Sequence, residues 1–447
     1  MSSKASSNPC DDQPEKKKFY VNFNQDKTSL CVGDGVTWRI LDINDGEDVR
    51  PSYKGGEEEV YLIEKLFASS LVAVVTVDAP RMLKVRHYKR GTEICNYTYA
   101  SSILNIKMNR ERLCVILRDS CHIHDIHTMA VLHTIGETPP NNNGLCALSW
   151  GDPKVHLLAY PSSITAGYVQ IFDTSHLVSR ITIKAHESPL VAMAFNPEGT
   201  LLATASVKGT LIRVHNVADG TRVAAFRRGI SRCVNIHSLT FSICGRYVGA
   251  SSNTETIHIY KIPDNIVKAA SEQTWMAYFS TYLPTRLADT LDTERDFAIT
   301  HLPVTEDMKK VIAIKEIGGY LRLFVATEEG VLYIYNIDRD TGSMTLMKKV
   351  NFSNDQAESE QVAPTEGPTL LGSYAGIVKG NPAGQMSAPE LRIPDSFHRI
   401  RQVEGSPGGH SSSSRRHLSS ELRAGVSPAH ARLRHEPAGA SDSRAPH

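Results

Sequence analysis

The sequence lacks the features that mark several large classes of protein. It has no run of about 18 apolar residues, so no membrane-spanning helix is predicted. Its polar residues 1–18 do not resemble a signal peptide. Lysine and arginine (49) balance aspartate and glutamate (48), so we expect no binding to nucleic acid, and any anion binding has to be local. Phosphate-loop, dinucleotide-binding and serine-nucleophile motifs are missing, so we predict neither an enzyme nor a cofactor.

Cysteine is present without the spacing that indicates a disulfide framework or a metal site. The eight cysteines include no C-x-x-C pair, which favours reduced thiols in a cytoplasmic protein. Residues 121–127 (CHIHDIH) contain several metal-ligating side chains, but no second cluster at structural zinc spacing completes a site. We therefore predict no bound metal.

What the sequence does contain is an internal repeat. Residues 191–206 align without a gap over residues 237–252, with Phe195 over Phe241, an offset of 241 − 195 = 46. A period of this size with short β-rich runs is typical of propeller blades. Weaker copies elsewhere bring the total to seven, and helical periodicity is nearly absent before residue 340. We predict an all-β, seven-bladed β-propeller of WD40-like repeats over residues 18–352; a two-domain β-sandwich would not explain the gapless repeat.

Three segments fall outside the repeat. Residues 1–17 and 353–447 have too few large apolar side chains to fold, and we predict that they are disordered. Residues 264–299 form an insertion too long for a blade turn, which is either a hydrophobic cluster packed on the blade or a membrane-facing loop. We favour the loop because an insertion has no neighbouring blade to pack against, and tryptophan and tyrosine prefer the headgroup boundary. The residues expected to insert are Trp275, Met276, Tyr278, Phe279, Tyr282 and Leu283.

The tetrapeptide Phe226-Arg227-Arg228-Gly229 lies between the two clearest copies of the repeat. On an extended strand, Arg227 and Arg228 point to opposite faces because side chains alternate. A guanidinium fork suits phosphate oxygens, and Gly229 would permit a close backbone approach. An isolated Arg-Arg pair is more often a solvated surface feature, but here serine and threonine recur at matching positions of both flanking repeats. We therefore expect two separate phosphate-binding pockets.

This tetrapeptide and its surroundings resemble the PROPPIN family, the phosphoinositide-binding propellers that include the animal WIPI proteins of autophagy. The resemblance covers residues 18–352, whereas residues 398–447 depart from it. It implies a non-enzymatic, monomeric, peripheral protein of autophagosomal and endosomal membranes that binds phosphatidylinositol 3-phosphate and 3,5-bisphosphate. The other stretches that carry the resemblance are Lys184-Ala-His-Glu-Ser-Pro-Leu190, Leu202-Ala-Thr-Ala-Ser206, Gly209-Thr-Leu-Ile-Arg213, Ile257-His258-Ile-Tyr260, Asn109-Arg-Glu-Arg-Leu113 and, from Val131, VLHTIGETPP.

The resemblance also implies which residues form the two headgroup pockets. The first would combine Arg227 with His186, Thr204, Ser206, Gly209, Thr210 and Arg213. The second would combine Arg228 with Gly229, Ser252, Thr254, Thr256 and His258. Hydroxyl donors would complement the guanidinium, and a protonated His258 would add a charge-assisted bond. Without the family, Ser206 and Ser252 could equally serve to bond blade turns.

A further basic segment concerns a protein partner. Arg110 and Arg112 lie on a predicted turn between two strands. The simplest interpretation is that both side chains are solvated at the surface. In the WIPI proteins, the region between the second and third blades docks a partner from the ubiquitin-like lipid-conjugation machinery. The resemblance does not decide which of the two arginines would make the main contact. A propeller scaffold that binds only proteins remains the alternative function.

Overall fold

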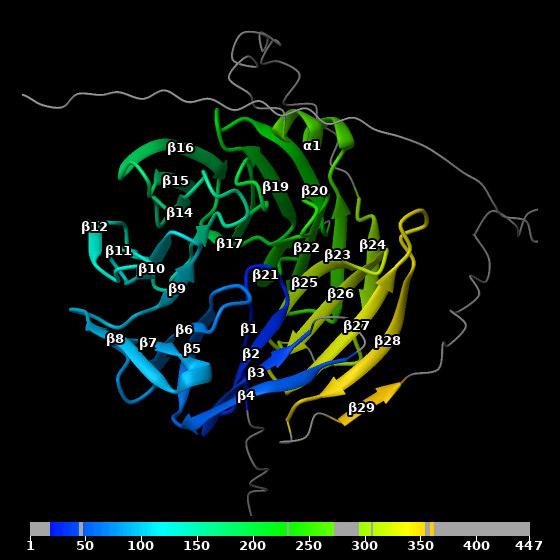
Figure 1. Ribbon diagram of the computed structural model, residues 1–447. Helices are drawn as coiled ribbons and strands as arrows, with labels where there is room; N and C mark the ends of the chain where they lie inside the picture. Colours follow the sequence, from blue (N-terminus) through cyan, green and yellow to red (C-terminus); the bar gives the residue numbers. More distant parts are fainter. Residues whose placement is uncertain are drawn as a thin grey trace, which may run out of the picture. The chain divides into compact units, whose positions relative to one another are not determined.

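The computed structural model describes residues 18–43, 48–229, 232–271, 295–304, 307–353 and 358–361. Within these residues, seven antiparallel sheets follow one another along the chain (Figure 1), and the strands of each sheet are consecutive in sequence. The first four sheets, or blades, consist of β1 Tyr20–Phe23, β2 Ser29–Gly33, β3 Thr37–Asp42 and β4 Arg50–Glu57; β5 Val60–Lys65, β6 Leu71–Thr76, β7 Met82–His87 and β8 Thr92–Thr98; β9 Asn105–Met108, β10 Arg112–Ile116, β11 Cys121–Asp125 and β12 Val131–Ile135; and β13 Ala147–Leu148, β14 Leu157–Pro161, β15 Gly167–Asp173 and β16 Val178–His186.

Three more blades complete the fold. They consist of β17 Leu190–Phe195, β18 Leu201–Ser206, β19 Leu211–Asn216 and β20 Arg222–Arg227; β21 Ile236–Phe241, β22 Tyr247–Ser252, β23 Thr256–Lys261 and β24 Ala298–His301; and β25 Lys310–Ile317, β26 Tyr320–Thr327, β27 Val331–Ile337, β28 Met344–Asn351 and β29 Glu358–Gln361. A 3-10 turn, η1 Tyr88–Arg90, and one helix, α1 Asp264–Ser271, accompany the strands of the described residues.

The blades form a closed ring around an axis. The first strand of each blade contacts the first strand of the next, and β25 of the last blade contacts β1 of the first. Among the described residues, each of the seven hydrophobic clusters lies between two neighbouring blades. The predicted seven-bladed propeller is therefore confirmed, and its stability comes from burial of apolar side chains at the blade junctions.

The 46-residue repeat corresponds to blades 5 and 6. Phe195 and Phe241 end the first strands of these blades, and both are buried. Gly199 and Gly245 occupy the turns that follow, at φ of 72° and 69°. This left-handed backbone favours glycine, which explains why glycine recurs at this position of the repeat.

Among the described strands, none is exchanged between blades 7 and 1, and the contacts that close the ring there are made by side chains and turns. The ring of Phe352 packs edge-on against Phe19, with centroids 5.9 Å apart. The Phe352 carbonyl accepts a 2.8 Å hydrogen bond from Arg39 Nη2 of blade 1. The Phe19 amide donates to the Glu328 carbonyl of blade 7 at 2.8 Å. These contacts join the two ends of the propeller chain.

Two elements were not expected from the sequence. The helix α1 opens the predicted 264–299 insertion, which joins β23 to β24, and Ile266 and Val267 of this helix pack on the core between blades 5 and 6. The strand β29 pairs with β28 inside the segment predicted to be a disordered tail. Both are short elements that follow blade strands and are stabilised by contact with them. Residues 1–17, and the tail apart from Ser353 and β29, lie outside the described residues.

We expect Phe352→Ala to destabilise the propeller by about 3–5 kcal/mol, because it removes a fully buried aromatic ring from the closing contact. Urea unfolding followed by tryptophan fluorescence would measure the change. Met347→Ala in β28, the strand that ends just before Phe352, is the control; this side chain is 39% exposed, and its loss should change stability by no more than about 0.5 kcal/mol. An equal effect of both substitutions would contradict the importance of this closure.

Candidate anion-binding site

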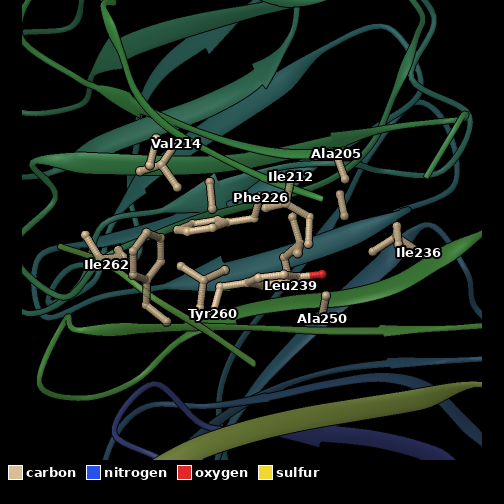
Figure 2. Packing of buried hydrophobic residues seen from close by; sticks show 14 of the residues in the cluster. Ala205, Ile212, Val214, Phe226, Ile236, Leu239, Ala250, Tyr260 and Ile262 are labelled. Atoms are coloured by element: carbon tan, nitrogen blue, oxygen red, sulfur yellow. The ribbon is translucent and has the colours of Figure 1, made fainter. Parts of the chain in front are cut away.

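The paired arginines lie where β20, the outermost strand of blade 5, ends beside blade 6. Phe226 is completely buried, and its ring stacks on Tyr260 of β23 with centroids 4.9 Å apart and planes at 19° (Figure 2). This contact holds the face of β20 that carries Phe226 against blade 6. The orientation of the two residues that follow is therefore set by the alternation of side chains along the strand.

The alternation separates the two arginines. Arg228 lies two residues after Phe226, so its side chain points to the same face and bonds the hydroxyl groups of blade 6. Arg227 ends β20 opposite Leu211, and Ala225 lies opposite Arg213, so Arg227 shares the other face of the blade with Arg213. The structure therefore places the arginines on different sides of blade 5. Whether each binds a headgroup remains a prediction.

Arg228 is the centre of a polar group that we call the Arg228 cluster, which also contains Ser252, Thr254, Thr256 and His258. Its Nη2 atom donates to Ser252 Oγ at 2.8 Å, to Thr256 Oγ1 at 3.4 Å and to Thr254 Oγ1. Thr256 Oγ1 is also 3.1 Å from His258 Nε2. A guanidinium has five N–H donors. Because the bonds to described residues all use Nη2, Nη1 and Nε retain donors that could meet an anion.

The surroundings of this cluster keep His258 neutral and make the charge of Arg228 costly in free energy. Burial and the neighbouring Arg228 charge lower the pKa of His258 to about 4, while Asp296, 3.8 Å away, opposes the shift. Burial also lowers the pKa of Arg228. The additional charge-assisted bond expected from protonated His258 is thus absent at neutral pH unless an anion raises this pKa.

A second group, the His186 cluster of His186, Thr204 and Arg213, lies between blades 4 and 5. His186 Nε2 is 3.0 Å from Thr204 Oγ1, and Arg213 Nη1 donates to the Ala185 carbonyl at 2.6 Å. Burial and Arg213 lower the pKa of His186 to about 4. These residues belong to the first predicted pocket, and they lie on the side of blade 5 that carries Arg227.

The remaining predicted pocket residues form the turns around these clusters. Ser206 ends β18, and its carbonyl accepts from the Gly209 amide at 2.8 Å, while the Thr210 carbonyl accepts from the Arg228 amide at 2.9 Å. Gly209 has a φ of 61°, and a Cβ there would lie 2.0 Å from the Val234 carbonyl oxygen, so only glycine fits. Gly229 is different, since an added Cβ would meet no heavy atom closer than 3.9 Å. The surrounding protein therefore leaves room for a side chain at Gly229, and a close backbone approach to a bound phosphate at this residue remains a prediction.

One residue near the Arg228 cluster has no signal in the local sequence. Lys310, the first residue of β25, is completely buried. Its ammonium donates to the carbonyls of Ser252, Thr254 and Met308 at 3.1, 3.0 and 2.9 Å. It comes from the next blade, more than fifty residues further along the chain, so the repeat pattern could not reveal it.

The two arginines of the predicted partner site have different surroundings. Arg110 is exposed, with its guanidinium carbon 4.1 Å from the centroid of the Phe67 ring. Arg112 is half-buried, and its Nε donates to the Thr174 carbonyl of blade 4 at 2.9 Å. Arg112 therefore links two blades, whereas Arg110 presents its charge to solvent.

Other predicted features lie elsewhere or outside the described residues. The six residues expected to enter a membrane, between Trp275 and Leu283, are not described. No helix of the described residues is long and apolar enough to cross a bilayer. His122 and His124 bond Thr134 Oγ1 at 3.1 Å and Tyr99 Oη at 2.6 Å, and no metal-ligating group of three occurs among the described residues. A cavity of about 190 Å³ on the axis is lined by the inner strands and does not include the paired arginines.

Comparison with known proteins gives a family match. The PROPPIN family profile matches residues 19–352. A chicken (Gallus gallus) protein named WD repeat domain phosphoinositide-interacting protein 2 is 44% identical over 81% of this chain and 86% of its own length. The human WD repeat domain phosphoinositide-interacting protein 1 is 40% identical over 80% of this chain and 82% of its own. The Caenorhabditis elegans Autophagy-related protein 18 is 35% identical over 86% and 97%, respectively.

Solved structures give the same fold. The complex of KlAtg21 with the coiled-coil of AgAtg16 superposes with a TM-score of 0.61, at 26% identity, over 75% of this chain and 99% of the matched chain. The structure of Kluyvelomyces marxianus Hsv2 superposes with a TM-score of 0.59 at 18% identity over 77% and 99%, which shows the fold alone.

The buried histidines predict a pH-dependent stability. Burial is the main cause that lowers the pKa of His186, His237 and His258 to about 4 and that of His215 to about 3. An unfolded histidine titrates near 6.5, so between pH 6.5 and 4 the unfolded chain binds more protons than the folded chain. The contribution of these neutral histidines to the free energy of unfolding is therefore fully present above about pH 6.5, and it is lost as the pH falls to 4. At pH 5 the loss should be on the order of 1–2 kcal/mol for each of these histidines.

Urea unfolding at pH 7 and pH 5 would measure this loss, and His215→Gln should reduce the difference between the two pH values. His176→Gln, on a side chain that is 73% exposed, is the control and should leave the difference nearly unchanged. Equal stability of the wild-type protein at both pH values would show that these histidines do not stay neutral in the folded state.

Proposed function

The chain belongs to the PROPPIN family, and from this premise we propose that it is a phosphoinositide effector of autophagy. In this proposal it binds phosphatidylinositol 3-phosphate and 3,5-bisphosphate through two sites, one at Arg227 and one at Arg228. It would then recruit autophagy factors to forming autophagosomal membranes. The names of the relatives, which mention phosphoinositide interaction and autophagy, support the broad function.

The observation that carries the proposal is the Arg228 cluster. A half-buried guanidinium is bonded to three hydroxyl groups, and no carboxylate of the described residues pairs with it. Removing a cation from water without a counter-ion is costly, so this arrangement favours a bound anion. Hydroxyl groups can also donate to phosphate oxygens while they accept from the guanidinium. A phosphate ester is the anion that this combination of donors fits best.

Two sites on one strand also suit a membrane surface. Arg227 and Arg228 face different blades, so two lipid headgroups could be bound at once. Simultaneous binding raises the apparent affinity well above that of either site. This argument favours a lipid effector over the alternative, a propeller scaffold that binds only proteins and uses both arginines for structure.

We expect Arg227→Ala and Arg228→Ala each to weaken binding to vesicles that contain phosphatidylinositol 3-phosphate by about ten-fold or more, because loss of one site removes the avidity. The double substitution should abolish binding. Vesicle flotation across the phosphoinositide series would measure this, with urea unfolding to verify the fold. Arg339→Ala, which removes an arginine paired with Glu316 on blade 7, is the control and should bind normally.

Retention of lipid binding by the double variant would refute the arginine sites. If the wild-type protein floats equally with vesicles that lack phosphoinositides, or with none, the protein-only scaffold becomes the better explanation.

We further propose that Arg110 contacts an acidic coiled-coil partner of the lipid-conjugation machinery. In the solved complex of KlAtg21, the protein bound to that propeller is a coiled-coil of AgAtg16. Here Arg110 is exposed beside Phe67, so it offers both a cation and an aromatic surface. Arg112, which bonds the Thr174 carbonyl, is the less accessible of the two arginines.

Charge reversal of Arg110 should therefore abolish binding to a purified Atg16-type coiled-coil in a pull-down and leave vesicle binding intact, because Arg110 lies two blades from the paired arginines. Arg339→Glu reverses a charge on a distant blade and should retain both activities. Loss of both activities in the Arg110→Glu variant would point to misfolding, and retention of the coiled-coil would exclude Arg110 as a contact.

A further inference from the structure

We propose that Lys310 is a positioning residue for the second anion site, holding the turn between β22 and β23 so that its hydroxyl groups face Arg228. This inference rests on the proposed function and assigns a role to a residue of blade 7, a blade that supplies none of the other residues of either site. Lys310 itself is completely buried, so it would act through the residues that it bonds and not through contact with an anion.

The turn is held from two sides by the same residues. The hydroxyl groups of Ser252 and Thr254 accept hydrogen bonds from Arg228. The backbone carbonyls of these two residues accept hydrogen bonds from Lys310 Nζ at 3.1 and 3.0 Å. Each residue thus directs its hydroxyl toward the Arg228 cluster and its carbonyl toward blade 7.

This division matters for an anion. A carbonyl oxygen carries partial negative charge, so carbonyls that turned toward the cluster would repel a phosphate group. Lys310 has three donors, and Ser252, Thr254 and Met308 use all three through their carbonyls. While Lys310 is in place, the carbonyls of Ser252 and Thr254 are therefore held by blade 7, and the hydroxyl groups of these residues face Arg228.

Neighbouring bonds strengthen the same junction. Ser251 Oγ donates to the Lys310 carbonyl at 2.8 Å. The Asp307 amide donates to the Asn253 carbonyl at 2.9 Å, and Asn253 Nδ2 donates to Asp307 Oδ1 at 3.1 Å. Every residue from 251 to 254 is therefore bonded to the segment that begins blade 7.

The charge of Lys310 acts in the same direction as its hydrogen bonds. Among the described residues no carboxylate lies within ion-pair distance of its ammonium, and its partners are carbonyl groups. The carboxylates that influence it, of Glu328, Asp307 and Glu255, act at longer range. Behind the hydroxyl groups there is consequently a second cation, which raises the positive potential where an anion would bind.

The test uses two arginine backgrounds that isolate each site. In Arg227→Ala protein, where only the second site remains, Lys310→Met should weaken binding of soluble inositol 1,3-bisphosphate by about ten-fold or more, measured by titration calorimetry. In Arg228→Ala protein, where only the first site remains, Lys310→Met should leave the affinity unchanged. A general loss of folding would instead lower binding in both backgrounds.

Lys65→Met is the matched control. Lys65 is also buried, at 2% exposure, and its ammonium bonds the Phe67 carbonyl, but it lies in blade 2. It should lower stability without changing headgroup affinity in either background. Lys310→Arg, which keeps the charge and the donors, should recover most of the affinity that Lys310→Met loses.

If Lys310→Met does not fold, Ser251→Ala is the second test, because it removes a hydroxyl group that bonds the Lys310 carbonyl without changing any charge. It should weaken binding only in the Arg227→Ala background. Unchanged affinity in the Lys310→Met protein, or in the Ser251→Ala protein where the first cannot be made, would overturn the inference. Headgroup binding that is insensitive to both Arg227→Ala and Arg228→Ala would instead overturn the proposed function, so the two failures can be told apart.

Discussion

The stacking of Phe226 on Tyr260 is the contact on which the candidate site depends. Phe226 is completely buried in the core between blades 5 and 6, and its stacking fixes which face of β20 meets blade 6. Because side chains alternate along a strand, this one contact also decides that Arg228 lies on the side of blade 6 and Arg227 on the side of blade 4. A shift of β20 by one residue would bury an arginine and expose an aromatic ring. The register of the strand is therefore strongly specified, and so is the separation of the arginines.

The candidate site belongs to blade junctions and not to any single blade. The Arg228 cluster takes its guanidinium from blade 5 and its hydroxyl groups from blade 6, and Lys310 of blade 7 bonds the same turn. The hydrophobic clusters of the described residues also lie between blades, so the contacts that stabilise the ring hold these side chains in place. Ring closure through Phe352, Phe19 and Arg39 completes this arrangement.

The sequence predicted what depends on local pattern. The gapless repeat of 46 residues identified two successive blades, and the alternation of Phe226, Arg227 and Arg228 predicted their divergence. Contacts between blades were not predictable in this way, because Lys310 and the Arg112 bond to Thr174 join residues that are about sixty positions apart. The sequence also did not distinguish Gly209, where packing against Val234 requires glycine, from Gly229, where an added Cβ would meet no heavy atom closer than 3.9 Å. The helix α1 escaped detection because its two core-packing residues, Ile266 and Val267, are too few to produce a helical period.

The charge distribution explains how a protein with a formal net charge of +1 could still recognise an anion. The whole chain offers little long-range attraction, so recognition has to depend on a few desolvated groups. Burial lowers the pKa of Arg228, and His258 stays neutral at pH 7. The guanidinium of Arg228 and the ammonium of Lys310 therefore supply the positive charge on the two sides of the turn between β22 and β23. Among the described residues, no adjacent carboxylate pairs with Arg228 or Lys310, and the hydrogen bonds of both side chains go to neutral oxygens. A bound phosphate group would supply the missing negative charge, and it would gain most where the surrounding protein has already excluded water.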